Sequence, residues 1–372
     1  MNTIRRLIYG EILVAVGFVL LAFLSLFFFF DLVDELPAIG TASRITAGAS
    51  YTLTEALIYT ALLIPSRVYE LMPIAVLIGS VFVLARFAQS SEFTILRTSG
   101  LGPWRALRTL LGLGLAFVLM TLAVGDYLAP LADRTGQLLK ARYQGSISVG
   151  QTGAWLKERQ TYSQFSVNVR ALEPNGGLSG IRIFEFDNQG YLVSTTEAAS
   201  AVIGNDGAWV LQGVQRQELD VAGQEAARVV RQGLEELRWP SGITADMVSV
   251  ALLKPERMRT VDLFAYVRHL QANGQSAQQY EIEFWRKLFY PLSCLVMVVL
   301  ALPFAYLHFR SGNITAYVFM GVMIGISFFL LNNVFGYIGN LQQWRPWLAA
   351  ASPALIYSVL SLGAFGWLVL RR

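Results

Sequence analysis

Six long apolar segments, arranged three and three around a polar insert, limit what this chain can fold into. A helix needs about 20 mostly apolar residues to cross the hydrocarbon of a bilayer, and each segment has close to that length. Because backbone amides in lipid must find partners within their own segment, each span is predicted to be an α-helix. The sequence therefore predicts an α-helical polytopic membrane protein with six transmembrane helices. They are expected at Ile12–Phe30, Ala56–Ala85, Ala106–Leu128, Leu288–Leu307, Ile314–Ile338 and Trp347–Leu370.

The polar insert between the third and fourth segments runs from Ala129 to about Ile282. Within it, Phe165 and Val167 alternate with polar residues, and this period of two indicates a half-buried strand. Turn sequences rich in Asn, Asp and Gly separate this run from other short apolar runs, which favours an antiparallel β-sandwich or jelly roll. A short helix is expected over Val261–Ala272. The predicted domains are 1–128 with spans one to three, 129–282 with the β jelly roll and short helix, and 283–372 with spans four to six.

Composition argues against several classes of site. Only 15% of the residues are charged, against about 25% in ordinary soluble domains. Cys294 is the one cysteine of the sequence, so no intrachain disulfide can form. His269 and His308 are far apart in sequence and have no cysteine or carboxylate at ligand spacing. We therefore expect no metal and no cofactor in this chain.

The distribution of charge predicts the orientation of the spans. Basic residues in short loops mark the cytoplasmic face. If the spans alternate, one side carries most of the basic residues, and the other side carries acidic residues with a smaller basic set. Both termini are therefore expected in the cytoplasm and the insert outside it. The basic side holds Arg5, Arg6, Arg86, Arg97, Arg105, Arg108, Arg310, Arg371 and Arg372, and the other side holds Asp31, Asp34, Glu35 and Asp126.

The second segment is the least regular of the six. Arg67 and Glu70 interrupt it, and Pro65 and Pro73 bracket them. We expect an interfacial helix, a break near Pro65 and then the crossing. An ionisable residue near membrane depth is a functional candidate. The alternative is that Arg67 and Glu70 form an i,i+3 pair at the level of the headgroups.

No motif for nucleotide binding or nucleophilic catalysis is present in the sequence. A phosphate-binding loop needs Gly-Lys-Ser/Thr, and none of the four lysines, Lys140, Lys157, Lys254 and Lys287, follows a glycine. Neither histidine is expected at membrane depth beside a serine, so a Ser–His pair is poorly supported. The chain is thus predicted to have no catalytic residues, and ATP-driven work would have to come from a partner with its own ATP and Mg²⁺.

The loop between the second and third segments has the features of a docking helix. Ser91 is a suitable N-cap, Glu92 favours the positive end of a helix, and Gly100 is a natural stop. A helix near 91–100 would lie on the cytosolic face and present apolar side chains beside charges, as docking of a soluble partner requires. The alternative is an amphipathic interfacial loop with no partner. The side chains expected at the contact are Glu92, Phe93, Leu96 and Arg97, which pair at i,i+4 as Glu92 with Leu96 and Phe93 with Arg97.

These features together resemble the lipopolysaccharide export permeases, which are paired subunits called F and G. The resemblance covers essentially the whole chain and rests on the three-insert-three order and on the loop from Ser91 to Gly100. Gly153-Ala-Trp155-Leu-Lys157 and Gly180-Ile-Arg-Ile-Phe-Glu-Phe-Asp187 favour the G type, as does the approach to the fourth span with Gly274, Tyr280 and Trp285.

The resemblance implies a concrete function. In that family an F/G heterodimer sits on two copies of a cytosolic ATP-binding subunit. The assembly extracts lipopolysaccharide from the Gram-negative inner membrane and passes it along periplasmic jelly-roll domains, which include a single-span jelly-roll subunit and a bridge protein. The loop helix with Glu92 would be the coupling helix, and the first and fifth spans would form lateral gates. Such a gate would suit Phe27 to Phe30 and the pair Phe328 and Phe329, although aromatic residues there are more often lipid-facing or core.

One departure from the family pattern concerns the outer end of the first span. The family's G subunits carry lysines there that would meet the phosphates of the substrate, whereas this chain has Asp31, Asp34 and Glu35. The resemblance then suggests that the phosphate contact lies at Arg67, Arg286 or Lys287, with plain interfacial anchoring as the alternative for the last two. Two rival functions remain at this stage: a permease of another envelope lipid or lipoprotein exporter, and a structural or regulatory membrane protein without transport.

Overall fold

A computed structural model of the chain consists of two compact units. The first unit comprises Met1–Asp34, Thr60–Ala132 and Gln278–Arg372, and the second comprises Glu35–Tyr59 and Asp133–Ala277. The segment Glu35–Tyr59, which the sequence analysis grouped with the first three spans, thus clusters with the insert. The structure describes residues 2–41, 50–90, 92, 95, 98, 100, 102–144, 153–160, 162–172, 177–204, 207–220, 228–244, 247–248, 255–306 and 314–370.

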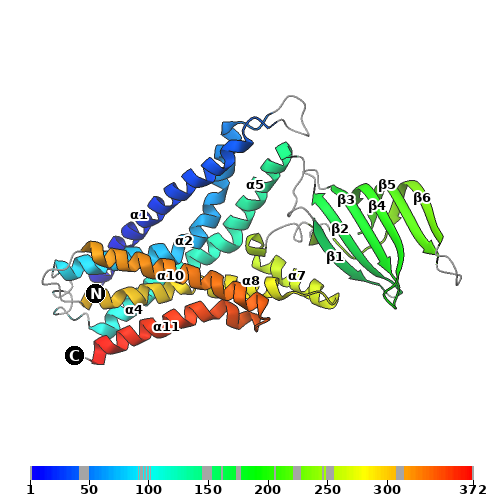
Figure 1. Ribbon diagram of the computed structural model, residues 1–372. Helices are drawn as coiled ribbons and strands as arrows, with labels where there is room; N and C mark the ends of the chain where they lie inside the picture. The colour runs from blue at the N-terminus through cyan, green and yellow to red at the C-terminus, as the bar shows by residue number, and fades with distance from the viewer. Residues whose placement is uncertain are drawn as a thin grey trace. The chain divides into compact units, whose positions relative to one another are not determined.

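The first unit is helical (Figure 1). Over the described residues, five of its helices are long and apolar enough to cross a membrane. A bent pair, α8 with α9 and η4, makes a sixth if it is counted as one span, and its two parts meet at 46°. The expected number of six spans is therefore reached only if α8, α9 and η4 are counted as one span. The helices are α1 (Asn2–Glu35), α2 (Leu53–Gln89), α4 (Pro103–Ala123), η2 (Val124–Leu128), α5 (Ala129–Gln144), α8 (Gln278–Phe289), α9 (Ser293–Ala301), η4 (Leu302–Tyr306), α10 (Ile314–Leu341) and α11 (Pro346–Leu370).

The expected break near Pro65 is wrong, because α2 runs without interruption through both Pro65 and Pro73. A proline removes one backbone donor, but it does not end a helix that its neighbours hold on several sides. The helix begins at Leu53 behind a capping box. Thr52 Oγ1 donates to the Glu55 carboxylate, and the Thr52 amide donates to Glu55 Oε2 at 2.9 Å.

The core of the first unit lies around α2, α4 and α9. Met72, Leu77 and Leu84 of α2 are fully buried, and Leu113 of α4 and Met297 of α9 join them. Phe328 of α10 and Tyr357 of α11 belong to the same core, and α11 packs against α8, α9 and α10. By contrast, α1 contributes few buried apolar residues, and all of them lie in its first half: Ile8, Ile12 and Val16.

The second unit contains one antiparallel sheet of six described strands in the order β1 to β6 (Figure 1). The strand predicted around Phe165 and Val167 is confirmed, and so is the helix expected at Val261–Ala272, which is α7 (Thr260–Ala272). A meander of neighbours is not the Greek-key order of a double-sheet jelly roll. The described strands therefore do not confirm the jelly roll. They are β1 (Ala154–Arg159), β2 (Gln164–Leu172), β3 (Leu178–Phe186), β4 (Leu192–Ile203), β5 (Trp209–Asp220) and β6 (Arg228–Trp239).

The sheet is strongly curled. Phe165 of β2 and Trp239 of β6 are separated by three strands, yet their ring centroids lie 5.5 Å from each other. Beyond β6, Ser241 Oγ and the Gly242 amide both donate to the Glu158 carboxylate at the end of β1, at 2.6 and 2.8 Å. These contacts bring the two edges of the sheet toward each other.

Two glycines change which side chains face the interior of the sheet. Residues three apart on a regular strand point to opposite faces. On β3, however, Leu178 and Ile181 are both buried, with Gly180 between them. On β5, Leu211 and Val214 are likewise both buried, with Gly213 between them. Both glycines have positive φ, 65° and 62°, which other residues rarely adopt. The buried face therefore moves by one residue along these strands while the pairing register is kept.

Candidate functional site

Most of the predicted coupling helix lies outside the described residues. Phe93, Leu96 and Arg97 belong to that part, and of the four predicted contact residues the structure describes Glu92 alone, which is exposed. Trp104, at the start of the next span, packs edge-on against Phe365 of α11, with centroids 5.4 Å apart. The coupling role of the loop stays a prediction.

The outer end of α1 is joined to α2 through Arg67. Its Nε and Nη2 donate to the two carboxylate oxygens of Asp31 at 3.1 and 2.7 Å. Its Nη1 reaches Glu70 Oε2 at 3.2 Å, so the predicted i,i+3 pair is present. The guanidinium also lies 5.0 Å from the ring centroid of Phe27. A planar guanidinium matches the two oxygens of a carboxylate, and this fork is a polar link between α1 and α2.

These contacts bear on the prediction that Arg67 meets a substrate phosphate. Its cationic charge already faces two carboxylates, so the cluster of Asp31, Arg67 and Glu70 is net negative. A phosphate would have to displace Asp31 from the guanidinium or arrive with a cation. Asp34 is exposed and Phe30 is 54% exposed, so both are open to the surroundings of α1.

A cluster in the second unit, formed by Glu35, Tyr51 and Lys140, was missed by the sequence analysis. Lys140 Nζ lies 2.5 Å from the buried Glu35 carboxylate and 4.8 Å from the ring centroid of Tyr59. Tyr51 Oη donates to Glu35 at 3.3 Å. Burial, followed by the Glu35 charge, raises the pKa of Tyr51, which keeps this hydroxyl protonated as a donor.

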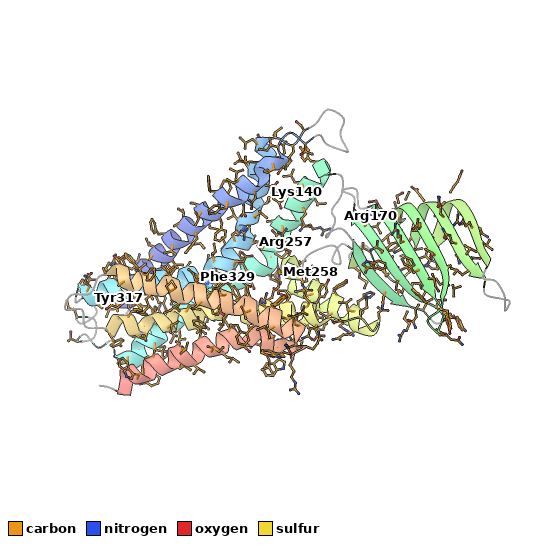
Figure 2. All side chains as sticks on the ribbon, viewed as in Figure 1. Lys140, Arg170, Arg257, Met258, Tyr317 and Phe329 are labelled. Carbon is orange, nitrogen blue, oxygen red and sulfur yellow. The ribbon has the colours of Figure 1, made fainter. Side chains whose placement is uncertain are left out.

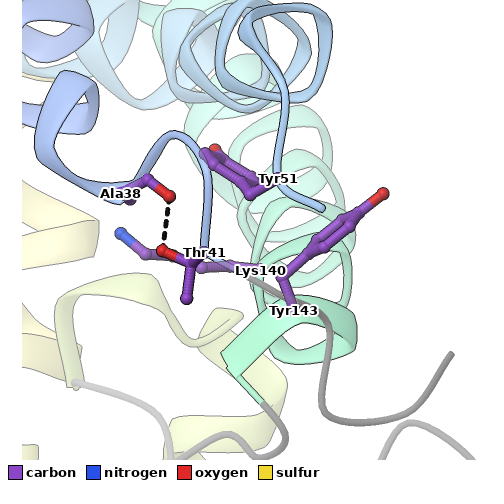
Figure 3. Close-up of a pocket in the computed structure, with 5 residues that line it drawn as sticks. All are labelled: Ala38, Thr41, Tyr51, Lys140 and Tyr143. Carbon is purple, nitrogen blue, oxygen red and sulfur yellow. Dashed lines mark hydrogen bonds between the residues drawn. The ribbon is translucent and has the colours of Figure 1, made fainter. Parts of the chain in front are cut away.

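The same cluster lines a small hollow, which Figure 3 shows with Ala38, Thr41, Tyr51, Lys140 and Tyr143. Thr41 Oγ1 donates to the Ala38 carbonyl at 2.6 Å, and Tyr51 packs edge-on against Tyr143. No sequence pattern could have indicated the Glu35–Lys140 pair, because 105 residues separate the two side chains. The carboxylate counted in the acidic outer end is therefore neutralised by a lysine from α5.

Arg286 is largely buried and contacts the fifth apolar helix. Its Nη1 pairs with Glu283 at 3.0 Å, and its Nη2 donates to the Asn332 carbonyl of α10 at 3.3 Å. A Cβ at Gly336 would overlap the guanidinium, so this glycine makes the space that Arg286 occupies. Arg286 thus lies against a neighbouring helix.

Lys287 is also buried, with 6% of its surface exposed. Its Nζ lies 3.4 Å from the Gly125 carbonyl oxygen, in the π-helical turn η2. Adjacent residues of α8 point in different directions around the helix. Arg286 and Lys287 accordingly reach two different spans.

The predicted gate aromatics of the fifth apolar segment separate into two kinds. Phe328 is buried between Tyr290 and Tyr357, with centroid distances of 6.1 and 5.3 Å, and so forms part of the core. Phe329, labelled on α10 in Figure 2, is 38% exposed. Only the second side chain is available for contact with a molecule outside the unit.

Over the described residues, no group of three or more His, Cys, Asp or Glu side chains gathers in a way that could hold a metal ion. The predicted site residues that the structure describes are arginine, lysine, carboxylate and aromatic side chains of the first, second, fourth and fifth apolar segments.

Comparison with known proteins decides the family. The family model "Lipopolysaccharide export system permease LptF/LptG" matches residues 6–371. The chain belongs to the LptF/LptG family. It is 28% identical over 374 residues to the lipopolysaccharide export system permease protein LptG of Escherichia coli strain K12, covering all of this chain and 99% of that protein. It is 27% identical, with the same coverage, to the LptG protein of Haemophilus influenzae.

Membership of the LptF/LptG family agrees with the apolar helices and with the antiparallel sheet between them. The LptF/LptG proteins are permease subunits of a transporter and not enzymes in themselves. With several helices long enough to span, the chain is a multi-pass protein of the inner membrane.

Proposed function

We propose that this chain is the G-type permease subunit of an ATP-driven lipopolysaccharide exporter, which extracts lipopolysaccharide from the inner membrane and passes it to a periplasmic bridge. The observation that carries the proposal is the end-to-end agreement with LptG proteins, which leaves neither the spans nor the insert unmatched. The rival permeases considered above place their outer domain differently, after the first of four spans.

The proposed topology has six spans, with both termini in the cytoplasm and the insert in the periplasm. The concentration of arginine in the loops and termini on one side supports it. An F-type permease would complete the heterodimer by covering the exposed apolar side chains of α1, such as Phe18, Leu21 and Phe29.

The insert would act as the periplasmic jelly-roll domain that receives the lipid. Its curled sheet has an apolar inner face that includes Leu156, Val167 and Ile183. A curled apolar face suits acyl chains because it removes them from water. A single-span jelly-roll subunit and a bridge protein would continue this surface.

The energy would come from two copies of a cytosolic ATPase, because the sequence has no Gly-Lys-Ser/Thr loop. Glu92, Phe93, Leu96 and Arg97 would seat in that ATPase. The substrate would contact the exposed aromatic residues Phe30 and Phe329 near the gates, and its phosphates would be bridged by cations to the acidic outer end of α1 or reach Arg67 after displacing Asp31.

Co-expression with an F-type permease and the ATPase tests the proposal. The chain should purify in a complex that hydrolyses ATP and releases lipopolysaccharide from proteoliposomes to an added bridge protein. Glu92→Lys should reduce release at least about tenfold, because loss of a charged hydrogen bond costs about 1.5–3 kcal/mol. Glu256→Lys, a charge reversal at an exposed carboxylate to which the proposal gives no role, is the matched control. A chain that never purifies with an ATPase would refute the transporter function, and full release by Glu92→Lys would refute the coupling role alone.

A further inference from the structure

The third span contains a defect in its helical hydrogen bonding. Between α4 and α5, the five residues of η2 form a π turn, and the Ala129 amide bonds to the Val124 carbonyl, five residues back. In that register the next donor, residue 130, would serve the Gly125 carbonyl. Residue 130 is a proline and has no amide hydrogen. The Gly125 carbonyl therefore lacks its helical partner because of the sequence itself.

Lys287 supplies a donor at this carbonyl. Its Nζ lies 3.4 Å from Gly125 oxygen, which is the long end of a hydrogen bond, but the contact is buried and the donor is a cation. In a low-dielectric interior a carbonyl without any donor costs about 1–3 kcal/mol. Lys287 thus supplies the hydrogen bond that Pro130 cannot donate, although 162 residues of sequence separate Lys287 from Gly125.

Aromatic packing from α2 fixes the same turn. A Cβ at Gly125 would overlap the ring of Tyr69, so the ring lies directly on the glycine backbone. Tyr69 in turn packs against Tyr290, with centroids 5.2 Å apart, and Tyr290 Oη donates to the Glu70 carbonyl at 2.5 Å. Lys287 therefore contacts the third span and Tyr290 contacts the second, so both residues are attached to spans that precede the insert.

The residues of this contact lie at the two ends of the insert. Gly125 and Pro130 come just before the insert begins at Asp133, and Lys287 comes just after it ends at Ala277. The bond thus joins the two stretches of the first unit through which the insert is attached. We propose that Gly125, Pro130 and Lys287, here called the stem contact, hold these two stretches together, and that Lys287 is a positioning residue that makes them move as one during transport.

This inference rests on the proposed function, because movement in transport presupposes a transporter. π turns are often found at functional sites, where a helix must adjust without losing its partners. With the stem contact intact, a shift of the third span is passed to α8 and therefore to both attachments of the insert. Without it, α4 and α8 move independently, and the insert receives no coordinated displacement.

A double-mutant cycle on Lys287 and Pro130 tests the stem contact. Spin labels at Leu131→Cys and Leu288→Cys, both exposed positions, report the separation of the two stretches in the full complex in nanodiscs. The native Cys294 is buried and should not be labelled. Lys287→Ala should broaden the distance distribution and lower lipopolysaccharide release at least about tenfold.

The decisive variant carries both changes. Pro130→Ala restores an amide hydrogen within reach of Gly125, so the Pro130→Ala, Lys287→Ala double variant should regain a narrow distribution and most of the release. Lys287→Arg, which keeps a cationic donor, should resemble the unmodified protein, and Lys157→Ala, an exposed lysine on β1, serves as the control.

Several results would overturn the stem contact. These are a Lys287→Ala distribution as narrow as that of the unmodified chain, a double variant as broad as the single one, and a double variant that fails to fold. If Lys287→Ala alone does not fold, recovery of the folded complex by Pro130→Ala supports the proposal. A wild-type complex that releases no lipopolysaccharide refutes the proposed function, while the label distances still decide the stem contact.

Discussion

The first and second helices have similar length and hydropathy but opposite environments. In the most apolar 18 residues of α1, 17% are buried within the chain, whereas the corresponding share in α2 is 83%. The apolar residues of α2 belong to a core cluster that also holds residues of α4, α9 and α10, and the apolar face of α1 must be covered by lipid or by another protein. Hydropathy therefore identifies a span but does not say which of its faces meets protein.

The largest expected effect contrasts one leucine in each helix. Leu77 of α2 is fully buried and Leu21 of α1 is 64% exposed. Leu77→Ala should destabilise the chain by about 2–5 kcal/mol, because it leaves a cavity in a packed core. Leu21→Ala should change stability by less than about 0.5 kcal/mol in the isolated chain. Thermal unfolding in nanodiscs measures both, and similar losses for the two variants would contradict the difference in burial.

A smaller effect is expected where the two helices touch. A Cβ on Gly79 of α2 would lie 2.7 Å from both Cγ2 and the backbone nitrogen of Val16. Gly79→Val should therefore push α1 away from α2 and cost about 1–3 kcal/mol. Gly17→Ala on α1, where a Cβ meets nothing within 4 Å, is the matched control and should be neutral or slightly stabilising. A neutral Gly79→Val would mean that α1 does not pack here.

The smallest effect concerns the polar link at the outer end of α1. Asp31→Asn should cost about 1–2 kcal/mol, because it weakens a forked, partly buried ion pair and leaves Arg67 with Glu70 alone. The exchange Asp31→Arg with Arg67→Asp should recover part of this loss. Crosslinking between cysteines placed near positions 31 and 67 gives the second readout. If Asp31→Asn crosslinks as well as the unmodified pair, the ion pair does not hold α1.

The difference between α1 and α2 also explains what could be predicted from the sequence. The apolar runs, the strand alternation around Phe165 and the helix at Thr260–Ala272 follow from local patterns, and the structure has them. The break expected at Pro65 was wrong because tertiary packing around α2 outweighs a local rule about proline. The curl of the sheet depends on Phe165 meeting Trp239, a contact between distant residues that no local pattern indicates.

In the candidate site, too, local spacing predicted some contacts, and contacts between distant residues were not predicted. The i,i+3 pair of Arg67 and Glu70 was predicted from spacing, but Asp31 is 36 residues away and went unrecognised as the main partner of Arg67. Lys287 was considered as a ligand or an anchor, and its contact with Gly125 was not foreseen. Pro130 by itself points to the carbonyl four residues back, at residue 126, and only the π turn, which no sequence pattern indicated, shifts the register to Gly125.

The two ion pairs of α1 have a consequence for the kind of bilayer the protein tolerates. Glu11 pairs with Arg86 at 2.6 Å, and Asp31 pairs with Arg67 at 2.7 Å, and the two carboxylates are 20 positions apart along α1. That stretch of helix is about 30 Å long, which equals the thickness of a typical hydrocarbon layer. A helix attached at both levels is less free to tilt when acyl chains lengthen or shorten. The attachment of α1 should therefore respond to membrane thickness. Short-chain lipids should strain one of the two ion pairs, and long-chain lipids should strain the other.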